Sequence, residues 1–274
     1  MNRLFIFFPA VLLMFSSCNK DGGCNQKASF NYDPDGSSTE NCVWQPVDFE
    51  VSFKPVYGEI ELVLGDTITT ADNRKLTVDY FGMYFTEFAL NFNGANISFK
   101  NINEDCVAVT SDALLFNDEN RTFRSRILPS AGATLDSIMF NVGVDSCRNN
   151  GLDPSTQASG PFAPQVPTMY WGWASGYRFV SIDGMVDASA NADGSDIKQF
   201  EFHTGLNSLL RSVTLNLGAK EIVTDGVSLE LKVDFEKLLE GVDFTAEWST
   251  HTFDNRPLAE EITENATLSI SLDE

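Results

Sequence analysis

Positively charged side chains are scarce in this sequence. The 274 residues include 18 Lys and Arg against 39 Asp and Glu, which gives a formal net charge of −21 and an isoelectric point near 4.3. Nucleic acids and anionic lipid surfaces are bound through Lys and Arg, so this balance argues against both as partners. It is typical of a soluble acidic surface outside the cytoplasm.

Histidine is scarcer still, because His203 and His251 are the only two in the chain. A zinc enzyme with three histidine ligands is therefore excluded. The sequence also lacks a Gly-x-Ser-x-Gly motif and the glycine-rich loops that bind phosphate. We predict that the protein is not an enzyme, although a pair of catalytic carboxylates stays open because Asp and Glu are plentiful.

Long amphipathic helices and internal repeats are absent, and short alternating segments are common instead. Alternation of apolar and polar residues predicts strands at 49–54, 59–64, 95–99, 134–142, 198–202, 212–217 and 227–233, and a nearly continuous apolar run predicts a long strand at 77–93. Short helices are expected at 234–241 and 258–265. A proline-rich segment, 145–167, is expected to be a loop. Together these patterns predict an all-β fold, an antiparallel β-sandwich with a few short helices.

The N-terminus has the pattern of a lipoprotein signal peptide. A basic start and an apolar run of about a dozen residues, too short to span a bilayer, precede Ser16-Ser17-Cys18. This ending resembles a bacterial lipobox, in which the cysteine is lipidated and becomes the mature N-terminus. We expect residues 1–17 to be removed, residues 18–23 to form a lipidated tether, and the chain to be anchored at the periplasmic or cell-surface face of the bacterial outer membrane.

The other four cysteines form an even set in an oxidising compartment, which predicts two disulfides. Three pairings are formally open. Nearness in sequence favours Cys24 with Cys42 and Cys106 with Cys147.

A small disulfide-closed module is expected at residues 24–46. Its Gly-Cys opening, Asn-Tyr-Asp-Pro centre and closing cysteine resemble a short unit of Bacteroidetes surface proteins. Asp33 and Asp35 alternate as the oxygen ligands of calcium loops do, but the bidentate Glu of an EF-hand is missing. We favour a plain Asp-Pro-Asp-Gly turn over a calcium site.

The most distinctive stretch is Met169-Tyr170-Trp171-Gly172-Trp173, followed by Gly176-Tyr177 and by Phe200-Glu201-Phe202-His203-Thr204-Gly205. This sequence pattern resembles that of the copper-binding proteins of the MbnP family, and the resemblance extends from about Val47 to Leu272. It implies an MbnP-like sandwich domain at residues 47–274. It also implies Cu(I) binding and a tryptophan that a di-haem cytochrome c peroxidase-like partner oxidises to kynurenine. The residues it suggests are His203, His251 and Met169 as copper ligands, Trp171 or Trp173 as the modified residue, and Tyr170 and Tyr177 as pocket residues.

Two other interpretations of the aromatic run stay open. Tyr170, Trp171, Trp173 and Tyr177 could form a stacking surface for a carbohydrate or peptide. Alternatively, they could be ordinary hydrophobic core.

Overall fold

The computed structural model describes residues 23–27, 29–92, 95–100, 106, 112–129, 134–172, 175–222 and 225–273. The strands in these residues are β1 (Val47–Tyr57), β2 (Ile60–Glu61), β3 (Ile68–Thr69), β4 (Lys75–Phe92), β5 (Ala95–Ser98), β6 (Ala113–Phe116), β7 (Thr122–Ile127), β8 (Thr134–Val142), β9 (Tyr170–Gly172), β10 (Gly176–Asp187), β11 (Ile197–Gly205), β12 (Arg211–Glu221), β13 (Val227–Asp234), β14 (Ser249–Thr250) and β15 (Ile270–Leu272). The helices are α1 (Ser146–Gly151), α2 (Phe235–Leu238) and α3 (Arg256–Leu268).

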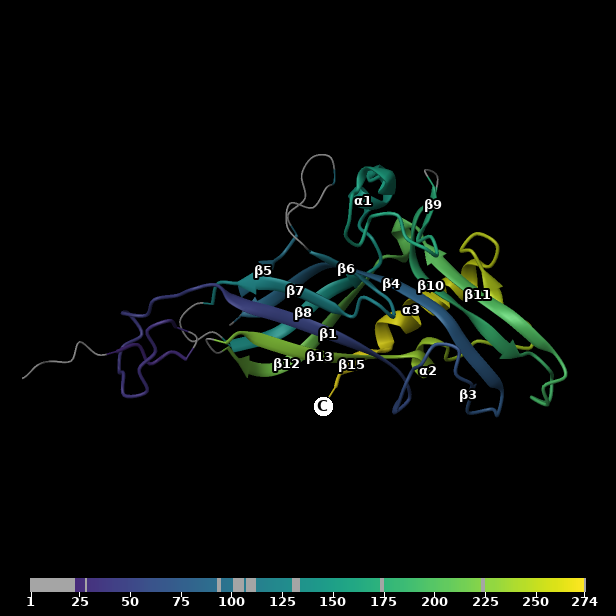
Figure 1. Cartoon of the computed structure of the whole chain (residues 1–274), viewed down its shortest axis with the longest axis horizontal. Helices are drawn as coiled ribbons and strands as arrows, with labels where there is room; N and C mark the ends of the chain where they lie inside the picture. Colours follow the sequence, from purple (N-terminus) through teal and green to yellow (C-terminus); the bar gives the residue numbers. More distant parts are fainter. Residues whose placement is uncertain are drawn as a thin grey trace, which may run out of the picture.

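Two sheets face each other and form the predicted β-sandwich (Figure 1). The larger sheet has the order β12-β8-β4-β10-β11-β14, with β3, β5 and β6 also paired to β4 and β9 paired to β10. The smaller sheet has the order β15-β13-β1-β2, and β7 pairs with β1 on the same edge as β2. Strand β4 is 18 residues long, and residues 81–86 in its middle are all buried, so both of its faces are covered as the apolar run predicted.

The sandwich is not antiparallel throughout. Strand β1 runs parallel to β13, with Phe49 beside Val227 and Phe53 beside Leu231, and β11 runs parallel to β14. Parallel neighbours cannot be joined by a hairpin and need a long connection, which here is most of the chain for β1 and β13. Alternation within a segment does not reveal this direction, so the prediction was right about the sandwich and wrong about these two pairs.

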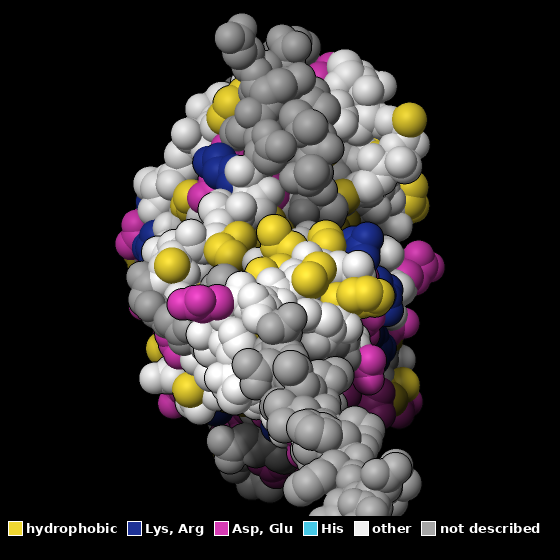
Figure 2. Space-filling view, turned by 90° about the vertical axis from the view of Figure 1, so that its left-hand side faces the viewer, with side chains coloured by type: hydrophobic (Ala, Val, Ile, Leu, Met, Phe, Trp, Pro, Cys, Tyr) yellow, Lys and Arg dark blue, Asp and Glu magenta, His cyan; other side chains and the backbone are white. Residues whose placement is uncertain are grey.

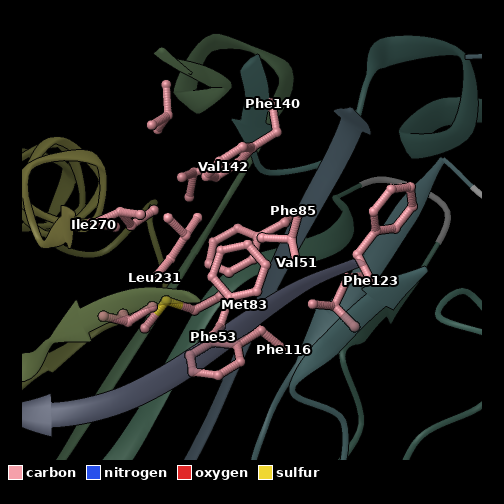
Figure 3. Close-up of a cluster of buried hydrophobic side chains, with 14 of the residues drawn as sticks. Val51, Phe53, Met83, Phe85, Phe116, Phe123, Phe140, Val142, Leu231 and Ile270 are labelled. Carbon is pink, nitrogen blue, oxygen red and sulfur yellow. The ribbon is translucent and has the colours of Figure 1, made fainter. Parts of the chain in front are cut away.

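Phenylalanines fill the space between the sheets (Figure 3). Phe53 from the smaller sheet meets Phe85, with ring centroids 4.5 Å apart, and Phe140, with centroids 5.7 Å apart and rings perpendicular. Strands β1, β4 and β8 supply these side chains. Successive residues of a strand point to opposite faces, so every second side chain enters this layer. Each fully buried Phe contributes roughly 1.5–3 kcal/mol to stability, so this layer dominates the energetics of the fold.

The outer face of the larger sheet carries a second apolar cluster, which is covered by the proline-rich segment. Tyr84 stacks on Phe162, with centroids 5.3 Å apart, and meets Tyr177 edge-on at 5.5 Å. The segment that covers them contains α1 and a 3-10 turn at Pro154–Thr156, so the expectation of a plain loop was wrong. The Asp145 carboxylate accepts the amide hydrogens of Cys147 and Arg148 and caps α1.

Other local predictions hold with small changes of extent. Helices α2 and α3 form where capping signals were present, with Asp234 and Asn255 as N-caps. The strand predicted at 59–64 shortens to β2, and β6 and β7 were not predicted.

Both favoured disulfides are confirmed, since Cys24 bonds to Cys42 and Cys106 to Cys147. Cys18 lies outside the described residues. Across the part of the chain that is described, no helix is long and apolar enough to cross a membrane.

Candidate functional site

The two histidines lie side by side at one edge of the larger sheet. Strand β11 pairs with β14 through Glu201 beside Ser249 and Phe202 beside Thr250, so the next residue of each segment is a histidine. The imidazole centroids of His203 and His251 are 4.9 Å apart, and the rings are nearly perpendicular at 82°. The structure therefore brings together residues that are 48 positions apart in the sequence.

A tight turn after β14 holds His251 in this place. Thr252 has a left-handed φ of 70°, and the amide of Phe253 donates to the carbonyl of His251 at 2.8 Å, which closes a γ-turn. This form of γ-turn is rare and strained, and strain of this kind gathers at functional sites. The buried Thr252 hydroxyl donates to the His203 carbonyl at 3.2 Å and accepts the Gly205 amide at 3.1 Å. The turn is thereby fastened to the strand that carries the other histidine.

Each histidine has a carboxylate partner on one ring nitrogen. The Asp183 Oδ1 atom lies 2.6 Å from His203 Nε2, and the Asp254 Oδ2 atom lies 3.1 Å from His251 Nδ1. A carboxylate accepts hydrogen bonds, so these contacts assign the imidazole proton to His203 Nε2 and to His251 Nδ1. The other nitrogen of His203, Nδ1, has no partner, whereas His251 Nε2 lies 3.8 Å from the Glu201 carboxylate, beyond hydrogen-bond distance.

The free nitrogen of His203 belongs to a group of unpartnered polar atoms. Among the described residues, four buried side-chain atoms lack a hydrogen-bond partner: Arg178 Nε, Ser181 Oγ, His203 Nδ1 and Thr204 Oγ1. Ser181 is directly opposite His203, and Arg178 is opposite Gly205, so three of the four atoms share the outer face of the sheet. Thr204 points to the other face, because it is adjacent to His203 in the strand. Buried polar atoms are nearly always paired, so three unpaired atoms on one face single out this part of the sheet as the candidate site.

Trp171 borders this group on the same face. A Cβ atom at Gly205 would lie 2.6 Å from Trp171 Cζ3, so the glycine is what lets the indole approach the strand. The guanidinium of Arg178 lies 5.7 Å from the centre of the indole ring. Burial lowers the pKa of Arg178, although the charges of Asp183 and Glu201 oppose this. Trp173 lies outside the described residues.

Met169, Tyr170 and Tyr177 lie apart from the histidines. The Met169 Sδ atom sits over Gly82, and the pairing of Gly82 with Ser181 and of Ser181 with His203 puts two strand spacings, about 10 Å, between Gly82 and His203. Met169 and both tyrosines line a cavity of about 250 Å³ on the covered outer face. The Tyr177 hydroxyl lies within hydrogen-bond distance of two carbonyl acceptors, Leu152 at 3.2 Å and Phe162 at 3.4 Å, so its polar end is already satisfied.

Asp33 and Asp35 form a turn of the disulfide-closed module. The Asp33 carboxylate accepts the amide of Asp35 at 3.0 Å, and the Asp33 carbonyl accepts the amide of Gly36 at 2.9 Å. Within the described residues, no group of three or more His, Cys, Asp and Glu side chains is arranged to hold a metal ion. In the described part of the chain, a metal at the histidine pair would therefore find fewer than three ligands of these four residue types.

Sequence reasoning missed the residues that support the histidines. Asp183, Ser181 and Arg178 are in β10, and only the register between β10 and β11 reveals that they face His203. The available signal was the spacing of Ser181 and Asp183, which puts both side chains on one face if this segment is extended.

Comparisons with known proteins agree with the resemblance seen in the sequence. A family model described as MbnP matches residues 46–255. The solved structure of MbnP from Methylosinus trichosporium is similar to this chain, with 17% sequence identity and a TM-score of 0.49 over 76% of this chain and 83% of that one. No curated protein matches.

Proposed function

This chain belongs to the MbnP family, and we propose that it is an extracytoplasmic protein that binds copper as Cu(I), for copper acquisition or handling, and that it is not an enzyme. The single observation that carries the proposal is the contact of His203 with His251, in which the buried His203 Nδ1 atom has no partner. Neutral imidazole is a good ligand for Cu(I), which is satisfied by few ligands.

The donor atoms we propose are His203 Nδ1 and His251 Nε2. Each is the nitrogen opposite a carboxylate contact, with Asp183 on His203 and Asp254 on His251. Histidine ligands of metals usually donate their second N–H to such a partner, which fixes the tautomer and raises the basicity of the ligand. We leave Met169 out of the ligand set, because its side chain is buried in the second apolar cluster.

Trp171 is our candidate for the oxidised residue, because its indole packs beside Gly205, two residues from His203. In the reaction we propose, a partner haem peroxidase supplies oxidising equivalents from two molecules of peroxide. The C2–C3 bond of the indole breaks, and each of the two carbons gains one oxygen atom from peroxide. The products are N-formylkynurenine and two waters, one from each peroxide. Hydrolysis then releases formate and leaves kynurenine. The amine and ketone of kynurenine can reach a metal, which indole cannot do.

For its location we propose that Cys18 is lipidated and anchors the chain to the outer membrane, with residues 24–46 as a small module before the copper-binding domain. The basic start, short apolar run and Ser-Ser-Cys ending of the sequence support this proposal.

A second candidate function is favoured by the aromatic cavity. Tyr170 and Tyr177 line a space of about 250 Å³ that could hold a sugar or peptide side chain. Chelators separate the two candidates, because such binding would not respond to removal of copper.

Copper titration in reducing buffer tests the first proposal. We expect wild type to bind one Cu(I) tightly and both His203→Ala and His251→Ala to lose tight binding, because two histidines leave no redundancy. The control is Met169→Leu, which should bind as wild type does. Intact mass after expression with the oxidising partner should rise by about 4 Da in wild type and not in Trp171→Phe. Full affinity in both histidine variants would refute the site.

A further inference from the structure

The end of the molecule that carries the disulfide-closed module has an exposed apolar surface. The exposed fractions are 68% for Phe30, 49% for Val43, 39% for Tyr32 and 58% for Leu128. We call these four side chains the apolar end surface. Figure 2 looks at the molecule from this end and shows hydrophobic side chains gathered in a band, with Lys and Arg at its edge. A group of this kind at one end is a common mark of an interaction site.

Two paired segments of the module carry Phe30 and Val43. Ser29 pairs with Trp44, and the Phe30 amide donates to the Val43 carbonyl at 2.8 Å. Ser29 is fully buried and Trp44 packs against the sandwich core, whereas the adjacent residues, Phe30 and Val43, are exposed. The fold therefore uses one face of this ribbon for packing and leaves the other face to solvent.

Leu128 belongs to the same end of the molecule. It follows Ile127, the last residue of β7, which pairs with Val47 at the start of β1. The Arg126 side chain donates to the Pro46 carbonyl at 3.0 Å, which ties the end of β7 to the segment that enters the module. The apolar end surface thus includes both the module and the adjacent edge of the sandwich.

We propose that the apolar end surface rests on the bilayer to which the chain is anchored. This inference depends on the lipidation of Cys18 proposed above. Four residues then lie between the lipidated cysteine and Gly23, and the five extended steps from one to the other span at most about 18 Å. Gly23 and the module are therefore held close to the headgroups. Phe, Leu and Tyr side chains partition into that region, whereas the net charge of −21 disfavours anionic lipid. The contact is apolar and needs zwitterionic lipid only.

Quenching of tryptophan fluorescence by brominated lipid tests this contact. The lipidated full-length protein is reconstituted in vesicles of phosphatidylcholine and phosphatidylethanolamine, with and without dibromo-phosphatidylcholine. Trp44, directly behind the apolar end surface, should be quenched, and Trp44→Phe should lose that quenching. The double variant Phe30→Ser/Val43→Ser should lose most of it as well. The matched control is Phe253→Ser, because Phe253 is also 68% exposed but lies beside His251, and it should be quenched as wild type is.

Each result has a distinct meaning. Equal quenching in the double variant and wild type, or an equal loss in Phe253→Ser, overturns the proposal. If a second copy of this chain covers the surface instead, wild type will be a dimer in detergent and Trp44 will not be quenched, which also overturns it. Failure of the anchor itself is seen separately, as an intact mass without fatty acid.

Discussion

At the scale of single residues, His203 stands out because one of its ring nitrogens is satisfied and the other is not. Asp183 holds Nε2 at 2.6 Å, whereas Nδ1 is buried without a partner. Leaving a buried acceptor unpaired costs about 1–3 kcal/mol, so the arrangement has to be held by its surroundings. Asp183 and the turn at Thr252 are the residues that hold it.

Replacing Asp183 with Asn tests the role of the carboxylate. Asn keeps the shape but removes the charge that orients the imidazole and raises its basicity. We expect the affinity for Cu(I) to fall by roughly 10–100-fold, as it does when such a partner of a metal ligand is lost. Competition with a Cu(I) chelator measures this. The control is Asp196→Asn, which removes a carboxylate paired only with the exposed Lys198 and should leave the affinity unchanged. Wild-type affinity in Asp183→Asn would show that the charge of the carboxylate does not support the ligand.

Thr252 should matter through its hydroxyl rather than its bulk. Thr252→Val removes the hydrogen bonds to the His203 carbonyl and from the Gly205 amide and leaves both backbone groups buried. We expect the free energy of unfolding to fall by about 1–3 kcal/mol and Cu(I) binding to weaken, because the two histidines are no longer fastened together. Thr252→Ser keeps the hydroxyl and should retain the affinity. A loss of affinity in Thr252→Ser equal to that in Thr252→Val would show that the hydroxyl is not the cause.

At the scale of elements, α1 is fixed to the sheet by a buried ion pair. Arg148 is fully buried, and its guanidinium donates two hydrogen bonds, of 2.8 and 3.0 Å, to the fully buried Asp112 and another to Asp145. Burial alone would lower the pKa of Arg148, but the hydrogen bonds and charge of Asp112 raise it above its ordinary value, so the guanidinium stays charged. Together with the disulfide at Cys147, it holds the covering segment over the second apolar cluster.

Arg148→Met should be strongly destabilising. It leaves the Asp112 carboxylate buried without its partner, and breaking a buried pair in this way costs about 3–5 kcal/mol. Chemical denaturation measures this cost. The control is Arg124→Met, whose pair with Glu50 is exposed at 2.7 Å and should contribute less than about 1 kcal/mol. Equal effects of the two changes would mean that Arg148 does not hold α1.

The sequence predicts an element where the residues of that element show a clear local pattern, and it does not reveal contacts between distant segments. Strand β8 has the bounds that its alternation predicted, because its pattern depends only on which side chains face the core. Strand β6 was missed because its four residues are all buried and show no alternation. Helix α1 was missed because it lies within a proline-rich segment, although Asp145 supplied a capping signal.

The candidate site shows the same limit. Both histidines could be chosen from their rarity and the family resemblance, but their contact depends on the parallel pairing of β11 with β14. Asp183 and Arg178 were not chosen, because their places beside His203 and Trp171 depend on the register of β10, including its irregularity between Arg178 and Val180. The register between strands that are far apart in the sequence cannot be read from either strand alone.

At the scale of the whole molecule, the module and the histidine pair are at different ends (Figure 1). The module is held to the sandwich by the packing of Trp44 and by an ion pair between Lys27 and Glu221, both side chains of which are about half exposed. The family match begins at residue 46, the last residue of the module. We infer that the module serves attachment and that the sandwich alone holds the copper site.

A chain that starts at Val47 tests this division of roles. Loss of Trp44 uncovers one part of the core, so we expect the free energy of unfolding to fall by no more than about 3 kcal/mol. The affinity for Cu(I) should stay at the wild-type value, because none of the described contacts of His203 or His251 involves the module. His251→Ala in the shortened chain is the control for specific binding and should abolish it. Denaturation and copper titration of the same samples separate the two effects. If the shortened chain folds but binds copper weakly, the module takes part in the site and the two ends of the molecule are not independent.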